Sequence, residues 1–233
     1  TWHITSTEEY RNRVIQLGER PESVFYLGAL GAENCLHINM ENVQTELHDL
    51  YNSFVVLFHP ETLNCVSPLD QVEEILKAVE PYTKYYNFIF IGSNADTHAD
   101  LITCRVKEFC DEHVNCHFYS NLHPDSYHYA VKQSIALIGN SSSGIIEVPS
   151  LGSYTINIGD RQTGRVKSSS ILDVRCNATV IIEAIQYVIE HKDEPIIETP
   201  YYKKNSAELY YQTTMNILHR DKQQYKEFYD IKF

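Results

Sequence analysis

The chain has 233 residues, 43% of them hydrophobic, which is enough to bury one core or a core and part of a second. Its 31 acidic and 19 basic side chains leave a net charge of −12, which argues against nucleic acid and anionic membrane surfaces as partners. The apolar runs are far shorter than a membrane span, and we read no secretory signal in the first residues.

The cysteines and histidines show no metal-binding spacing. The six cysteines form no C-x-x-C pair, and the 11 histidines form no H-x-H or H-E-x-x-H pattern. In a chain of this length such cysteines are typical of reduced, partly buried thiols. We therefore expect a cytoplasmic protein with no disulfide framework, no structural metal and no cofactor.

The first 50 residues predict one helix and one strand. Ser6 and Glu9 have the spacing of a capping box, so we expect a helix that begins after Ser6 and ends near Leu17, with Gly18 as its stop. Residues 24–27 form a strand-like run. Residues 38–52 are polar and aperiodic apart from one short helical stretch, and we interpret them as a crossing between two domains.

From residue 54 onward the sequence alternates between strands and helices. The predicted strands are residues 54–58, 88–91, 116–119, 135–138, 154–158 and 171–174. The first predicted helix is capped by Ser67 and Pro68, and the second carries Leu101, Ile102 and Phe109 on its apolar side. A third helix contains Tyr127. The last two helices, residues 178–191 and 205–219, are expected to close the domain. This alternation predicts an α/β fold: a parallel sheet with helices on both faces.

The stretch from Ser134 to Arg165 is the one around which the chain is organised. An apolar strand is followed by Ser141, Ser142 and Ser143 and then by a second apolar group with one carboxylate, Glu147. Strand, small-residue loop and helix start together place backbone N–H groups at one point, which favours an anion such as a phosphate. Glu147 lies about one turn further on, where it could accept from ribose hydroxyls. The alternative is a tight turn with a serine cap, and the loop by itself does not decide between them.

The next strand also ends in polar residues. Gly159 and Gly164 flank Arg161, and Arg165 follows, so two cations lie on a backbone that glycine makes adaptable. We interpret these arginines as anion partners, with a solvated basic face as the alternative for Arg165. Pro149 predicts that the helix between the two strands is short or kinked.

Two segments carry a resemblance to a known family. Residues 139–152, which open Gly139-Asn140-Ser141-Ser142-Ser143-Gly144, and residues 156–165 resemble the signature of the UDP-N-acetylglucosamine 2-epimerases. The likeness extends to residues 28–34, 58–62, 91–96 and 225–231, and it is closest to the hydrolysing branch, which makes N-acetylmannosamine for bacterial sialic acid synthesis. It implies a Rossmann-like domain that forms the C-terminal half of a GT-B-type two-domain fold.

The resemblance also implies domain limits. Residues 1–40 match the end of a first Rossmann-like domain and the crossover, residues 41–218 the UDP-binding domain, and residues 219–233 a C-terminal helix or tail. The chain opens on Thr1 without an initiator Met, and family members are considerably longer, so we expect the C-terminal part of such an enzyme.

Site residues carry over from the family position by position. His59 matches an active-site histidine near the sugar and phosphates, and we expect it to donate to a phosphate oxygen or to orient the sugar. Asn94 matches a nucleotide contact. The other matched positions contact the diphosphate and the ribose: Ser141, Ser142, Ser143, Gly144, Glu147 and Arg161. Glu33 and Arg165 are weaker candidates, and a surface carboxylate is the alternative for Glu33.

The implied reaction eliminates UDP from UDP-N-acetylglucosamine (UDP-GlcNAc) and then adds water to release N-acetylmannosamine. The family's proton-transfer carboxylates lie mainly in the first domain, so we expect this chain to bind UDP without useful turnover. A homo-oligomer, dimer or tetramer, is expected for the full-length enzyme. The alternatives are half of a GT-B glycosyltransferase and a non-catalytic nucleotide-binding module.

Overall fold

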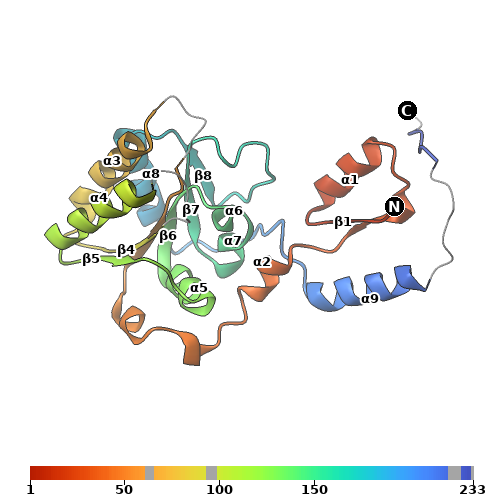
Figure 1. Ribbon diagram of the computed structural model, residues 1–233, viewed down its shortest axis with the longest axis horizontal. Helices are drawn as coiled ribbons and strands as arrows, with labels where there is room; N and C mark the ends of the chain where they lie inside the picture. Colours follow the sequence, from red (N-terminus) through yellow and green to blue (C-terminus); the bar gives the residue numbers. More distant parts are fainter. Residues whose placement is uncertain (61–65, 93–98, 220–226, 232–233) are drawn as a thin grey trace.

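The computed structural model describes residues 1–60, 66–92, 99–219 and 227–231, which form two separate parallel sheets (Figure 1). The strands are β1 (His3–Thr5), β2 (Val24–Tyr26), β3 (Ser53–Leu57), β4 (Asn87–Ile91), β5 (Cys116–Tyr119), β6 (Ser134–Gly139), β7 (Tyr154–Ile158) and β8 (Ile171–Val174). The α-helices are α1 (Glu8–Gln16), α2 (Leu30–Asn34), α3 (Pro68–Val79), α4 (Ala99–Glu112), α5 (Pro124–Gln133), α6 (Ser143–Ile146), α7 (Val148–Leu151), α8 (Ala178–His191) and α9 (Ser206–Leu218). Short 3₁₀ turns cover Pro21–Ser23, Met40–Asn42, Thr45–Asp49 and Glu80–Tyr82.

The larger sheet has six parallel strands in the order β5-β4-β3-β6-β7-β8. The chain first winds outward from β3 through β4 to β5, and it then returns to start β6 on the other side of β3. This reversal makes the β3–β6 boundary a topological switch point, where α/β proteins bind ligands beyond the carboxyl ends of the strands. The expected α/β fold, a Rossmann-like parallel sheet with helices on both faces, is confirmed.

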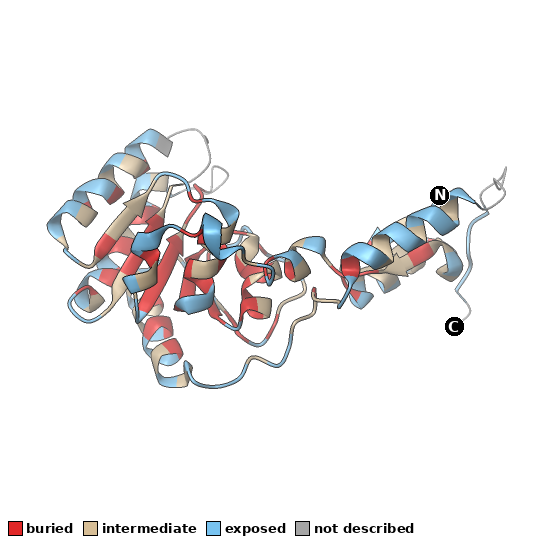
Figure 2. Cartoon of the chain, turned by 90° about the horizontal axis from the view of Figure 1, so that it is seen from below, coloured by how far each residue is buried: buried red, intermediate tan, exposed pale blue. Residues whose placement is uncertain are grey.

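Alternation along the strands builds a core on each face of this sheet. Phe54 and Val56 of β3 point into a cluster covered by α3, α4 and α8, whereas Val55 points into a second cluster with α5 and α7. Both faces of β3 are therefore apolar, as expected for a central parallel strand. Figure 2 shows the buried residues concentrated in this sheet and its covering helices.

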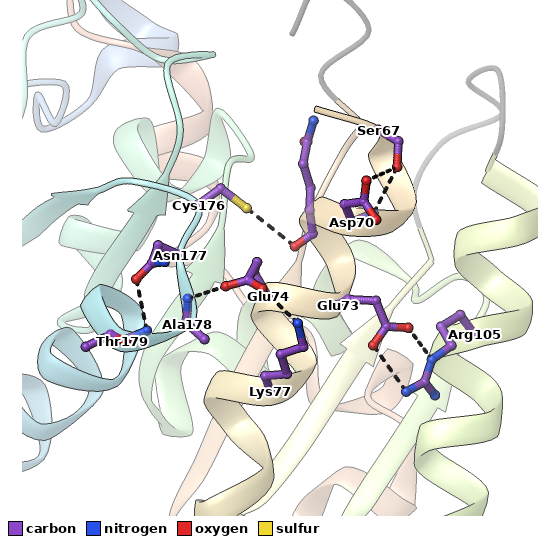
Figure 3. A network of polar contacts seen from close by, with 11 residues as sticks. Ser67, Asp70, Glu73, Glu74, Lys77, Arg105, Cys176, Asn177, Ala178 and Thr179 are labelled. Carbon is purple, nitrogen blue, oxygen red and sulfur yellow. Dashed lines mark hydrogen bonds and ion pairs between the residues drawn. The ribbon is translucent and has the colours of Figure 1, made fainter. Parts of the chain in front are cut away.

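Helix α3 is tied by polar contacts to both helices beside it (Figure 3). Glu73 pairs with Arg105 of α4, and Glu74 accepts a 2.8 Å hydrogen bond from the backbone N–H of Ala178 at the start of α8. The Ser67 hydroxyl accepts from the N–H of Asp70, which confirms the predicted cap of α3. These contacts hold the layer of helices opposite α5 and α7.

Two local predictions are wrong by a small margin. The N-cap of α1 is Thr7 rather than Ser6, because the Thr7 hydroxyl accepts from the N–H of Tyr10. Leu101 is 59% exposed, and the buried stripe of α4 runs through Ile102, Val106 and Phe109 instead. That stripe has the i, i+4, i+7 spacing of one helix face, which turns position 101 outward.

Helix α9 lies beside the small β1–β2 unit rather than over the six-stranded sheet, contrary to expectation (Figure 1). The Tyr210 hydroxyl donates to the carbonyl of Gly28, and the backbone N–H of Tyr229 donates to the carbonyl of Gly18. Segment 26–29 lies beside segment 200–203, since the Ala29 N–H donates to the carbonyl of Tyr201. The chain thus crosses twice between the two units.

Candidate functional site

An open pocket of about 300 Å³ lies at the switch point of the six-stranded sheet. Its walls come from the ends of β3, β4 and β6 and from the start of α5. The lining residues are Leu57, His59, Ile91, Gly92, Asn121, Leu122, Pro124, Tyr127, His128, Ser141 and Ser143. Three of the expected site residues, His59, Ser141 and Ser143, therefore line one pocket.

The serine loop begins at a glycine that no other residue could replace without a rearrangement. Gly139 has a φ of +148°, and a Cβ atom there would lie 1.9 Å from the carbonyl oxygen of Leu57. The close approach of β6 to β3 aims the loop at the pocket. Helices α6 and α7 that follow have four residues each, which confirms the short or broken helix expected from Pro149.

The loop offers fewer N–H donors than the sequence suggested. The N–H groups of Gly144 and Ile145 donate within the turn, to the carbonyls of Ser141 and Ser142. Gly144 is instead a packing residue, since a Cβ there would lie 2.8 Å from Cγ2 of Thr155. Among the described residues, neither the backbone N–H nor the hydroxyl of Ser142 has a hydrogen-bond partner, so both are available to a ligand.

Glu147 is held by a chain of hydroxyl groups. The Tyr127 hydroxyl donates to Ser143 over 2.7 Å, and the Ser143 hydroxyl donates to Oε2 of Glu147 over 2.6 Å. His128 Nε2 lies 3.6 Å from the same carboxylate oxygen. Burial raises the pKa of Glu147, but His128 and the Ser143 hydroxyl together lower it by more. The net pKa therefore lies below its ordinary value. The group is therefore a carboxylate, which can only accept hydrogen bonds.

Glu147 also faces the crossover from the first unit. Its other oxygen, Oε1, would lie 2.8 Å from a Cβ atom at Gly31, so glycine in α2 leaves room for the carboxylate. Cys35 is buried beneath it, and burial together with the Glu147 charge raises the pKa of that thiol to about 12. The Cys35 sulfur thus stays protonated and unreactive beside the carboxylate.

Buried Asn140 joins the segments that carry His59 and Arg161. Its side chain exchanges two hydrogen bonds with the backbone of His59, each 2.8 Å long. Its carbonyl accepts from Arg161 Nη1 at 3.0 Å and from Gln162 Nε2 at 2.8 Å. His59 and Arg161, which the sequence predicts as separate ligand contacts, are therefore connected through one residue.

The remaining predicted residues lie apart or cannot be placed. Glu33 caps α9, because it accepts from the Ser206 hydroxyl and from the N–H groups of Asn205 and Ala207. Arg165 is exposed on the loop after β7. Asn94 falls outside the described residues.

Sequence reasoning missed Tyr127 and His128 as parts of the site, and it gave Asn140 no role. Ser126 and His128 are buried polar residues on α5, but their burial follows from the fold, and no pattern in the sequence indicates it. Within the described ranges no group of three or more His, Cys, Asp or Glu side chains could hold a metal ion, and no helix is long and apolar enough to cross a bilayer.

Comparisons with known proteins identify the family of the chain. A model of the family described as UDP-N-acetylglucosamine 2-epimerase matches residues 1–214. The chain is 45% identical to the polysialic acid biosynthesis protein P7 of Escherichia coli over 98% of its own length and 60% of that protein. It is 33% identical to a hydrolysing GDP/UDP-N,N'-diacetylbacillosamine 2-epimerase of Campylobacter jejuni, over 75% of the chain and 47% of that enzyme.

Solved structures share the fold. The UDP-GlcNAc 2-epimerase of Neisseria meningitidis bound to UDP-GlcNAc superposes with a TM-score of 0.68 at 16% identity, over 92% of this chain and 60% of that one. The enzyme of Methanocaldococcus jannaschii in complex with UDP-GlcNAc and UDP gives a TM-score of 0.70 at 16% identity, over 91% and 60%. The chain thus spans about three fifths of these proteins and of its E. coli relative. It belongs to the UDP-N-acetylglucosamine 2-epimerase family.

Proposed function

We propose that this chain supplies the UDP-binding part of a hydrolysing UDP-GlcNAc 2-epimerase that releases UDP and N-acetylmannosamine for sialic acid synthesis. The observation that carries the proposal is the Glu147 carboxylate, fixed by Ser143 beside a pocket at the switch point of a parallel sheet. A relative named for polysialic acid biosynthesis supports the pathway, and relatives named as hydrolysing epimerases support the reaction type.

In this proposal each element of the site binds one part of UDP. Glu147 accepts hydrogen bonds from the ribose hydroxyls, since its carboxylate can accept from both. Ser141, Ser142 and Arg161 bind the diphosphate, whose negative charge grows when UDP leaves, so their donors stabilise the transition state more than the ground state. His59 donates to a phosphate oxygen or orients the sugar.

The proton transfers of the reaction need other groups. Elimination of UDP requires a base near C2 of the sugar, and the addition of water requires a proton donor. We assign these steps to carboxylates of a preceding domain, to which residues 1–40 would belong. In this scheme residues 41–218 form the UDP-binding domain, with residues 219–233 as a tail. The 233-residue chain should accordingly bind UDP and release no sugar.

Calorimetric titration of UDP tests the binding half of this proposal. The parent chain is expected to bind UDP, and a Glu147→Ala variant is expected to bind at least about tenfold more weakly, since a charged hydrogen-bond partner of the ribose is lost. A Glu74→Ala variant, changed on the α3 face far from the pocket, serves as the control. Equal affinity of parent and Glu147→Ala would show that the carboxylate does not contact the ligand.

Product analysis of the full-length enzyme tests the reaction. Free N-acetylmannosamine is the expected product. UDP-linked N-acetylmannosamine would identify a non-hydrolysing epimerase, and a glycoside would identify a GT-B glycosyltransferase. Turnover of a di-acetamido sugar nucleotide in preference to UDP-GlcNAc would correct the substrate, and an absence of all turnover would favour a nucleotide-binding module.

A further inference from the structure

Asn140 is fully buried, yet every polar group it carries is hydrogen-bonded. Its N–H donates to the carbonyl of Leu57 at 3.3 Å, and its carbonyl accepts from Arg161 and Gln162. Its carboxamide exchanges two hydrogen bonds with the backbone of His59. Buried polar networks that are fully satisfied specify one arrangement of the groups they connect. A residue with these contacts fixes geometry without touching a ligand.

The two hydrogen bonds to His59 act on its main chain. The His59 N–H donates to Oδ1 of Asn140, and Nδ2 of Asn140 donates to the His59 carbonyl, both over 2.8 Å. A carboxamide paired in this way resists both translation and rotation of the peptide that it holds. The backbone just after β3 is thereby fixed relative to the end of β6. The His59 side chain therefore starts from a defined position at the pocket.

The carbonyl of Asn140 fixes the loop after β7. Arg161 Nη1 and Gln162 Nε2 donate to it from two consecutive residues of that loop. Gln162 is only 2% exposed, so it anchors the loop from inside, whereas Arg161 lies at the surface. Arg161 and His59 are therefore both positioned by Asn140, although they are far apart in the sequence.

We propose that Asn140 is a positioning residue that sets the spacing between His59 and Arg161, so that both can act on one diphosphate. The ligand class rests on the proposed function, whereas the coupling of the two residues does not. Groups that stabilise the same developing charge must be held within a fraction of an ångström, which a single shared anchor achieves more directly than two independent loops. Ser141, the next residue, gains its place at the pocket from the same anchor.

Amide hydrogen exchange, followed by NMR on the ligand-free chain, tests the coupling without UDP. In Asn140→Ala, exchange at the His59 amide should accelerate at least about tenfold relative to the Leu137 amide of β6 in the same molecule, because its acceptor is gone. The matched control is Asn157→Ala, which deletes another buried carboxamide, one that donates to Asp173 at 2.7 Å. It should leave the ratio of the two exchange rates unchanged. A purely structural role would speed both amides equally and would overturn the proposal.

The isosteric variant Asn140→Asp keeps the test decisive if Asn140→Ala does not fold. It retains an acceptor for the His59 N–H but faces the His59 carbonyl with a second oxygen, so the His59 ring resonances should move from their positions in the parent. Resonances that stay in place would contradict the proposal.

UDP titration completes the experiment. The affinity for UDP should fall at least about tenfold in Asn140→Ala and less than about threefold in Asn157→Ala, as expected for lost positioning rather than lost stability. If the parent does not bind UDP, the proposed function fails, and the exchange ratio still decides the role of Asn140. If the parent binds and both variants lose affinity equally, the positioning role is wrong.

Discussion

The Ser143 hydroxyl donates a 2.6 Å hydrogen bond to Oε2 of Glu147, across the four residues of the short helix α6. The Tyr127 hydroxyl in turn donates to Ser143 at 2.7 Å. Ser143 is therefore the link between α5 and the carboxylate, and its hydroxyl is engaged within the protein, unlike that of the half-buried Ser142. This relay fixes the orientation of the Glu147 carboxylate.

Removal of the relay should weaken UDP binding. Ser143→Ala deletes the donor to Glu147, so we expect the dissociation constant for UDP to rise about tenfold, whereas Tyr127→Phe should have a smaller effect because Ser143 can still donate. Calorimetric titration measures both. Ser150→Ala is the control, since that buried hydroxyl in α7 has no partner among the described residues. Equal loss in Ser143→Ala and Ser150→Ala would contradict a specific role for the relay.

Glu147 should also contribute a pH-dependent part of the stability. Its folded pKa lies below the ordinary value, so the carboxylate stabilises the fold above the unfolded pKa, about 4.3, and this contribution is lost as pH falls through the folded pKa. The free energy of unfolding of the parent should therefore decrease more steeply below about pH 4.5 than that of Glu147→Gln. Urea unfolding at a series of pH values measures the difference. Parallel curves for the two proteins would show that Glu147 has no depressed pKa.

Gly139 should be among the least replaceable residues of the sheet. In Gly139→Ala the new Cβ would lie 1.9 Å from the carbonyl oxygen of Leu57, so β6 must separate from β3, and we expect a loss of about 3 kcal/mol or more. Gly152→Ala is the matched control, since Gly152 also has a positive φ, +83°, but no atom lies within 4 Å of its Cβ position. That change should cost about 1 kcal/mol, for backbone strain alone. Equal losses in urea unfolding would refute the clash.

Glu33 should affect stability and leave UDP binding intact. It accepts from the Ser206 hydroxyl and from two backbone N–H groups at the start of α9, and these bonds outweigh burial and lower its pKa. Glu33→Ala should therefore cost about 1 kcal/mol, as the loss of a helix cap does, and should reduce the helical circular dichroism signal. A large loss of UDP affinity in this variant, with stability unchanged, would instead place Glu33 at the ligand.

Much of the sheet was predictable, because its central strands are apolar on both faces and its strands are bounded by strong turn residues. The run around Phe54 and the β5 residues from Cys116 to Tyr119 match the structure closely. The exact N-cap was not predictable, since Ser6 and Thr7 are both favourable cap residues and the Glu three positions after Ser6 pointed to the wrong one. The exposure of Leu101 depends on which helix face meets the sheet, and two apolar neighbours in the sequence leave that open.

The site was predictable where a motif keeps its residues together and not where it depends on packing. Ser141, Ser143 and Glu147 follow one another in the sequence, so a local pattern indicates them. His128 reaches Glu147 from a different helix, and Asn140 joins segments that lie 81 and 21 positions away. Such contacts arise only after the sheet has formed, and no periodicity in the sequence encodes them.

The route of the chain has a consequence for the order in which it folds during synthesis. The six-stranded sheet is complete once α8 has been made, but the small β1–β2 unit also contacts Tyr210 and Tyr229, near the end of the chain. Both residues are translated after the six-stranded sheet, whereas the β1–β2 unit is translated before it. The β1–β2 unit therefore gains these contacts only after the sheet between them has been made, so the order of synthesis and the order of folding differ.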